Sequence, residues 1–298
     1  MAAHLPVELV GEIWRAAAEL FIEHEHRTVL NIAASCTIGY YAATPILYRT
    51  LLMRDGGVEL IMRVFNTEPI TSAPTLSTSP AERLCPLVRR ICSFGVPSSF
   101  NKDEIQRLTG LETICDTANS LLRTSLAPTL THFITWTTSW PERLPSTLTH
   151  VTLYCYFDTS AQVACEQLKQ YMVDTLPNSV TRFALTFCYA FPQDALAELV
   201  ALIPIILLRK GITMFCIGLS GAAADEPTYK LLLRAIATLQ VGDRNKIRLW
   251  RDMRSTSDPK NGFFVAGVRT DLVAGRTLWT EARPVMQEEL TAAVIPDA

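Results

Sequence analysis

Apolar side chains recur at helical spacing near the N-terminus of the chain. From residue 6 to residue 23 they fall on one face of a helix, and the glutamates lie mainly off that face. The residues of the apolar face are Leu9, Ile13, Ala17, Leu20 and Phe21. A polar connector follows, after which Thr28 is the expected N-cap of a second helix with an apolar run from Val29 to Cys36.

The pattern changes from helical to extended before residue 54. A third, short helix is expected over residues 40–43, and it should end before Pro45 because a proline disfavours helical backbone at the residue that precedes it. From Ile46 to Leu51 apolar and polar positions alternate, which is typical of a strand. We therefore expect residues 1–54 to form an N-terminal helical module.

A change of composition marks the next segment. Residues 57–66 predict another short helix, and residues 68–80 are rich in Pro, Ser and Thr, which is typical of an exposed loop. Residues 55–83 are therefore expected to form a helix and a flexible connector. Over residues 84–298 short β-rich runs alternate with helical segments, which favours parallel strands joined by helical crossovers.

An internal repeat sharpens this expectation. The run Leu148–Leu153 recurs as Val180–Leu185 and, more loosely, as Ile212–Ile217, with a spacing of 32 residues both times. Helix candidates over Ser160–Leu176 and Pro192–Leu208 follow the first two copies. Weaker copies lie at residues 87–91, 108–114 and 130–134. Because a fixed strand-plus-helix period is the signature of a solenoid, the expected fold class is α/β with a parallel sheet.

Composition and charge narrow the classes of function. Apolar residues make up 49% of the chain and charged residues 19%, which predicts a folded protein. A formal net charge of -2 provides no basic field for a phosphate backbone, so nucleic acid is not expected as a partner. The longest aliphatic run, Leu199–Leu208, is half the roughly 20 residues that span a bilayer, so no membrane association is expected.

The cysteines and the N-terminus indicate a compartment. The eight cysteines are dispersed, with no Cys-x-x-Cys pair and no Asn-x-Ser/Thr sequon, which favours reduced and mostly buried thiols. A signal peptide is not expected, since Glu8 and Glu12 interrupt the first apolar stretch. We therefore expect a cytoplasmic or nuclear location.

The N-terminal motifs resemble an F-box. The Leu-Pro-x-Glu-Leu opening at residues 5–9, the following Ile13, an apolar helix ending at Cys36 and the closing Leu-Tyr-Arg-Thr at residues 47–50 match the pattern of that family. The internal repeat is similar to a leucine-rich repeat, with a period longer than the roughly 20 to 29 residues of that class. The chain thus resembles fungal, mushroom-type F-box-like proteins with degenerate leucine-rich repeats.

This resemblance implies a division of labour. An F-box-like helical module would bind a Skp-type adaptor of a cullin-type ubiquitin ligase, and an irregular leucine-rich-repeat-like α/β solenoid would bind a protein client. The adaptor-binding residues that it implies form an apolar patch of Leu5, Pro6, Leu9, Ile13 and Leu30. Three alternatives stay open: the patch packs on the protein's own repeats, the chain is a protein-binding scaffold without a role in a ligase, or it is an enzyme with no recognisable motif.

Residues with catalytic or metal-binding chemistry are few. Glu23–His26 holds two imidazoles and two carboxylates, but a His-x-His pair without a second cluster is typical of a solvated connector. His150 is near Cys155 in sequence, yet strand alternation gives no reason for their side chains to meet. His132 and His150 are interpreted as outward polar positions of two repeat copies. With no nucleotide-binding or nucleophile motif either, we expect no enzyme, no cofactor and no metal site.

Overall fold

The structure, a computed structural model, describes residues 5–22, 25–53, 80–93, 106–116, 129–136, 144–155, 161–187, 193–252 and 278–294. Its helices are α1 Val7–Phe21, α2 His26–Ser35, α3 Thr37–Arg49, α5 Pro80–Leu84, η1 Cys85–Leu87, α7 Ala161–Asp174, α8 Gln193–Leu208, η2 Gly221–Ala224, α9 Glu226–Ala237, α10 Val241–Arg244, α12 Leu278–Glu281 and α13 Gln287–Val294. Its strands are β1 Thr50–Met53, β2 Arg90–Ser93, β3 Thr113–Asp116, β4 His132–Trp136, β5 His150–Cys155, β6 Arg182–Phe187, β7 Met214–Ser220, β8 Ile247–Asp252 and β9 Arg283–Pro284. The helix expected over 57–66 and most of the expected loop lie outside the described residues.

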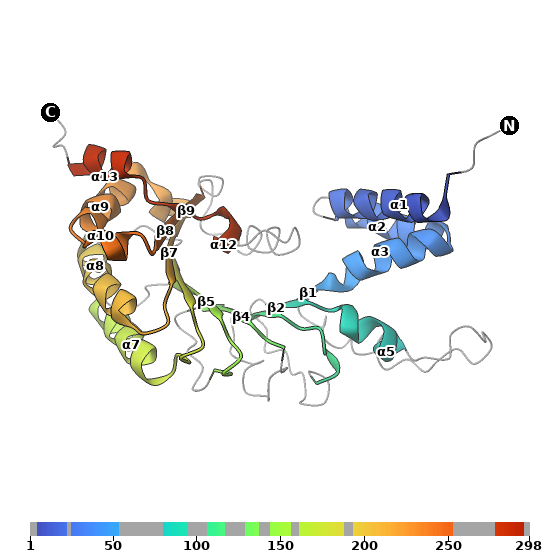
Figure 1. The fold of residues 1–298 in the computed structure, drawn as a ribbon, viewed down its shortest axis with the longest axis horizontal. Coiled ribbons are helices and arrows are strands. Elements are labelled where there is room, and N and C mark those ends of the chain that lie inside the picture. The colour runs from blue at the N-terminus through green and yellow to red at the C-terminus, as the bar shows by residue number, and fades with distance from the viewer. Residues whose placement is uncertain are drawn as a thin grey trace.

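Helices α1, α2 and α3 form a small bundle with a core of its own (Figure 1). The buried apolar side chains of this core come from the three helices and from Ile22, the residue directly after α1: Ala18, Ile22, Val29, Ile32, Ala43 and Ile46. This core is separate from the larger core beneath the sheet. The bundle joins the sheet through α3, which runs into β1, and through the amide of Arg89, which donates to the carbonyl of Arg49 at 2.9 Å.

The second helix begins earlier than the sequence predicts. Thr28 lies inside α2, whose first residue is His26, so the threonine is not the N-cap. The residue at the cap position is Glu25, and its side chain makes no capping hydrogen bond. The amide of Thr28 donates to the carbonyl of Glu25 at 2.9 Å, which is a bond of the first turn.

The third helix runs further than the sequence predicts. It continues through Pro45 to Arg49, and the strand begins only at Thr50, within the range expected for the helical module. A proline inside a helix removes one backbone hydrogen bond and strains the preceding turn. Burial of Ala43 and Ile46 on either side of Pro45 offsets that cost, because packing of an apolar face outweighs local helix propensity.

The sheet is built in chain order. Strands β1 to β8 are parallel, each beside the one before it, and β9 joins the far end antiparallel to β8. The chain therefore advances in one direction across the sheet and never doubles back. This mostly parallel nine-stranded sheet with its helices confirms the α/β class predicted from the sequence.

The 32-residue repeat appears directly as strand register. His150 on β5 pairs with Arg182 on β6, and Arg182 pairs with Met214 on β7. One position further along the strands, Phe183 pairs with Phe215, and both rings are fully buried. Each step in sequence thus places one strand beside the last without a shift of register.

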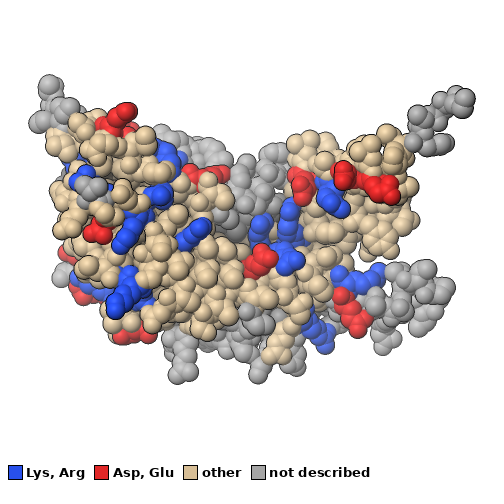
Figure 2. Space-filling view, in the orientation of Figure 1, with Lys and Arg blue, Asp and Glu red and all other residues tan. Residues whose placement is uncertain are grey.

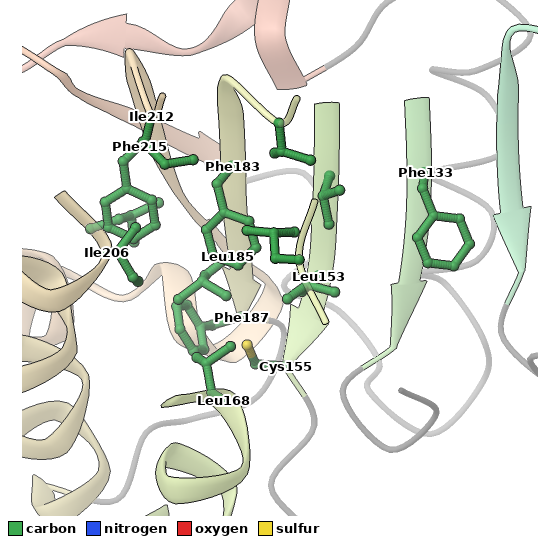
Figure 3. Packing of buried hydrophobic residues seen from close by; sticks show 14 of the residues in the cluster. Phe133, Leu153, Cys155, Leu168, Phe183, Leu185, Phe187, Ile206, Ile212 and Phe215 are labelled. Carbon is green, nitrogen blue, oxygen red and sulfur yellow. The ribbon is translucent and has the colours of Figure 1, made fainter. Parts of the chain in front are cut away.

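Helices α7, α8 and α9 lie along one side of the sheet beside strands β5 to β8 (Figure 1). Their apolar side chains meet alternate side chains of the strands: Leu168 of α7 lies by Phe187, and Ile206 of α8 lies by Phe215 (Figure 3). All four residues belong to the main core. The two helix candidates that follow the repeat copies in the sequence correspond to α7 and α8.

The last elements close the far end of the sheet. Helix α13 packs on α9, where Nε of Arg234 donates to the carbonyl of Ala293 at 2.6 Å. Arg283 on β9 pairs with Glu289 at 2.6 Å, which lowers the pKa of that carboxyl from 4.5 to about 2. Throughout the described ranges, no helix has both the length and the apolar character of a membrane span.

Gly39 on α3 lies close against α2, and this gives a test of the packing of the bundle. A Cβ added there would lie 2.3 Å from the carbonyl oxygen of Ile32 and 2.9 Å from Oγ of Ser35. Gly39→Ala is therefore expected to lower the free energy of unfolding by about 2 kcal/mol, measured by urea denaturation.

The matched control is Gly11→Ala in the same bundle. A Cβ at Gly11 would meet only Ile38, at an ordinary 3.7 Å. Because alanine is the better helix former, this variant is expected to be neutral or more stable by up to about 1 kcal/mol. Equal effects of the two substitutions would contradict the close packing of α3 on α2.

Candidate functional site

The apolar residues singled out by the F-box resemblance are all exposed. The exposed fractions are 57% for Leu5, 41% for Leu9, 51% for Ile13 and 55% for Leu30, and Pro6 is exposed as well. Leu9 and Ile13 are one helical turn apart on α1 and therefore neighbours on its surface. Pro6 directly precedes α1, and Leu30 lies on the adjacent α2.

Helix α1 carries two apolar stripes, and only one of them faces the bundle. Trp14 and Ala18 on α1 and Ile22 directly after it recur every four residues and pack into the small core. Leu9 and Ile13 belong to the other stripe, which is open to water. The stripe that periodicity detects in the sequence is thus largely the outward one, and such a surface is typical of an interaction site.

Much of the visible surface of the helical module carries no charged side chain. Figure 2 shows its charged side chains gathered in a band, with uncharged surface on both sides of that band. Within the module, Arg49 pairs with Glu19 at 3.7 Å.

A second candidate surface crosses the opposite side of the sheet from the helices. The first residues of β2 to β7 pair in one line, which we name the histidine row: Arg90, Thr113, His132, His150, Arg182 and Met214. The apolar residue that follows each of them belongs to the main core. Because successive strand side chains point to opposite faces, the histidine row lies on the face away from α7, α8 and α9.

The two imidazoles of the row stack on each other. The ring centroids of His132 and His150 are 3.9 Å apart, with 20° between the ring planes. Nδ1 of each ring lies 2.8 Å from Oγ1 of the preceding residue, Thr131 or Thr149. Each hydroxyl donates to a backbone carbonyl at 3.3 Å, so its oxygen accepts from the ring Nδ1–H. This assignment leaves Nε2 as the acceptor of each neutral ring.

Burial and neighbouring cations keep both rings neutral. Burial lowers the pKa of His132 from 6.5 to about 4, with a further contribution from the charges of Arg182 and Arg90. Burial lowers the pKa of His150 to about 3, with contributions from His132 and Arg182. At neutral pH the row therefore carries its positive charge on the arginines alone.

The short helix α12 lies over this face of the sheet. The indole of Trp279 meets the ring of His150 edge-on, with centroids 5.4 Å apart. Gly218 on β7 gives α12 room, since a Cβ there would lie 3.1 Å from Cδ1 of Leu278. The strand face on which a repeat protein would receive a client is thus partly covered by the chain's own C-terminal part.

The remaining chemical candidates of the sequence do not form a site in the described residues. His150 and Cys155 lie five positions apart on β5 and point to opposite faces, and Cys155 is buried in the main core. Glu23 and His24 lie outside the described residues. Among the residues that the structure describes, no three His, Cys, Asp or Glu side chains gather as metal ligands would.

The sequence did place His132, His150 and Arg182 at equivalent repeat positions. It did not predict that the two rings stack, nor that Trp279, more than a hundred residues later, lies against one of them. The available signal was the recurrence of a Thr-His pair, at residues 131–132 and 149–150, on neighbouring strands. Side chains at one register position of adjacent parallel strands must be neighbours.

The likeness to F-box-like proteins rests on the motifs at residues 5–9 and 47–50 and on the apolar run between them. The structure adds an exposed apolar face on the helices that follow the first motif. Comparison with known proteins gives no further support, since no family model, no curated protein and no solved structure matches this chain.

Proposed function

We propose that this chain is a substrate-recognition adaptor of a cullin-type ubiquitin ligase. Its F-box-like helices would bind a Skp-type adaptor, and its sheet domain, an irregular leucine-rich-repeat-like solenoid, would bind a protein client. The proposal assigns no catalytic step and no cofactor to this chain, because the chemistry of ubiquitin transfer lies in the other subunits of a ligase.

One observation carries the proposal. Leu5, Leu9, Ile13 and Leu30 are exposed although the bundle that presents them already has a core of its own. If these helices served only to cap the sheet, their apolar residues would be covered by it. Burial in a partner stabilises a complex by about 25 cal/mol for each Å² of apolar surface before the costs of association, so such a face favours binding.

The test is binding of the full chain to a purified Skp-type adaptor by isothermal titration calorimetry. Leu9→Asp combined with Ile13→Asp is expected to weaken binding about a hundredfold, since two anchor side chains leave the interface and two charges enter it. The free energy of unfolding should barely change, because both positions are exposed.

The matched control carries the same change on the sheet domain. Val173 on α7 and Leu208 on α8 are exposed apolar residues far from α1 in the chain, with exposed fractions of 74% and 80%. Val173→Asp combined with Leu208→Asp should bind the Skp-type adaptor like the unmodified chain. Absence of binding by the folded, unmodified chain would overturn the ligase role and favour a scaffold that binds proteins without a ligase.

The proposal also places the chain in the cytoplasm or the nucleus. Within the described ranges the cysteines form no disulfide, and all of them except Cys36 are buried. Buried thiols without disulfides are typical of a reducing compartment. Neither a membrane nor a nucleic acid is part of the proposed role.

A further inference from the structure

The histidine row holds a cation that the described part of the protein does not neutralise. Other arginines at the edges of the sheet pair with carboxylates: Arg89 with Glu112 at 3.1 Å, Arg251 with Glu226 at 2.9 Å and Arg283 with Glu289 at 2.6 Å. Within the described ranges no carboxylate pairs with Arg182, which lies beside His150 in register. Its charge instead acts on the two imidazoles of the row.

The imidazoles are oriented so that one nitrogen of each stays available. Thr131 and Thr149 hold Nδ1 of His132 and His150, and no other hydrogen bond to these rings is present among the described residues. The two rings stack on adjacent strands, and Arg182 occupies the same register position on the next strand. Two imidazoles and one guanidinium are thus gathered at neighbouring positions on one face of the sheet.

We propose that His132, His150 and Arg182 form a binding site for a compact oxyanion, the phosphate or carboxylate group of a ligand. The neighbouring arginines select an anion over a metal cation, because a cation would be repelled by the same charges that keep the imidazoles neutral. A bound oxyanion accepts from the guanidinium of Arg182. It also favours protonation at Nε2, so an imidazole takes up a proton from water and donates Nε2–H to the ligand.

The charged groups near the two rings agree with this selection. Arg182 on β6 acts on both rings, Arg90 on β2 acts on His132, and the carboxylate of Glu112 acts on Arg90. The contribution from α12 is the uncharged indole edge of Trp279. The carboxylate of Glu281 on α12 accepts from Nε1 of Trp250 at 3.2 Å. The site does not depend on binding of a Skp-type adaptor, since it lies on the sheet and not on α1 or α2.

The test follows the histidine signals of the full chain by NMR. The protein carries ¹³C-labelled histidine and is titrated downwards from neutral pH in sodium phosphate, sodium trifluoroacetate or sodium chloride at matched ionic strength. Trifluoroacetate is a carboxylate that stays ionised at the pH values where the two rings titrate. An opposite charge in contact with an imidazole raises its pKa by about one to two units. We therefore expect the pKa values of His132 and His150 to be higher in the oxyanion than in chloride by about one to two units. This rise in pKa should saturate as the concentration of the oxyanion increases.

Two variants separate the site from general screening. Arg182→Gln is expected to remove the oxyanion-dependent shift. Arg248→Gln should retain it, because Arg248 lies on β8 outside the row and donates to the carbonyls of Asn245 and Ile247. Thermal unfolding confirms that both variants are folded before their histidines are compared.

Some outcomes of this titration distinguish the possible chemical classes of the anion, and others would contradict the proposed site. A shift in phosphate alone identifies a phosphate ligand, a shift in trifluoroacetate alone identifies a carboxylate, and a shift in both identifies oxyanions as a class. Equal titration in phosphate, trifluoroacetate and chloride would overturn the proposal. A non-saturable shift that survives in Arg182→Gln would overturn it as well.

Discussion

Phe183→Ala is expected to lower the free energy of unfolding by about 4 kcal/mol, the largest effect of any single substitution considered for this protein. Phe183 is fully buried on β6, where its ring stacks on that of Phe215 with centroids 6.2 Å apart (Figure 3). Truncation removes both the transfer free energy of the ring and its contact with the next repeat, and it leaves a cavity between strands and helices.

Urea denaturation followed by circular dichroism measures this effect, with Phe21→Ala as the matched control. Phe21 ends α1 and is exposed, so the same truncation there should cost less than about 1 kcal/mol. Because repeats contact mainly their neighbours, Phe183→Ala should also reduce the slope of the unfolding transition if the sheet separates into two parts. Unfolding of Phe183→Ala at the urea concentration of the unmodified chain would show that this stacking does not stabilise the sheet.

The position of Phe183 shows which part of the fold the sequence predicts well. A run of alternating apolar and polar residues recurs after 32 positions, and it predicts both the strands and their register. The reason is that each copy has the same alternation of buried and exposed side chains. Helices α7 and α8 follow from the same period, since each must cover the apolar side of the strand before it. Local pattern and tertiary packing agree here.

The N-terminal bundle shows where local reasoning fails. Pro45 is a helix breaker by its own chemistry, yet α3 passes through it because Ala43 and Ile46 gain burial against the other two helices. In the same way, periodicity finds the apolar stripe with Leu9 and Ile13 but does not reveal that Trp14 and Ala18 are the residues facing the core. Both outcomes depend on which face meets a neighbour, and a single helix does not contain that information.

The two candidate sites also differ in how far the sequence predicts them. The motif at residues 5–9 identifies apolar residues, and their exposure supports a docking role. The histidine row is visible in the sequence only as polar residues at equivalent positions. Its chemistry comes from contacts between strands and from Trp279 of α12, which no periodicity connects to His150.

The two stacked histidines make the protein sensitive to acid, which is the second large effect that we expect. In the folded chain the pKa values of His132 and His150 lie near 4 and 3, below the 6.5 of an unfolded histidine. As the pH falls, the histidines of the unfolded state therefore bind protons before those of the folded state, and the free energy of unfolding decreases. The stability due to the neutral rings is complete above pH 6.5 and is lost progressively as the pH falls towards the folded pKa values.

The expected loss between pH 6.5 and 4.5 is about 2 kcal/mol, after a reduction for solvent screening because both rings are only partly buried. The upper part of this window reports the histidines. The carboxyl of Glu289, whose pKa is lowered from 4.5 to about 2, adds to the loss only as the pH approaches 4.5, where its unfolded form takes up a proton. Urea denaturation at a series of pH values across the window measures the slope of stability against pH.

The double variant His132→Gln, His150→Gln should show a flatter slope across this window, since glutamine keeps a polar side chain and binds no proton. His26→Gln serves as the control, because His26 is exposed at the start of α2, outside the histidine row. It should retain the slope of the unmodified chain. If the double variant loses stability as steeply as the unmodified chain, the acid sensitivity arises elsewhere and the rings are not held neutral by burial and by their arginine neighbours.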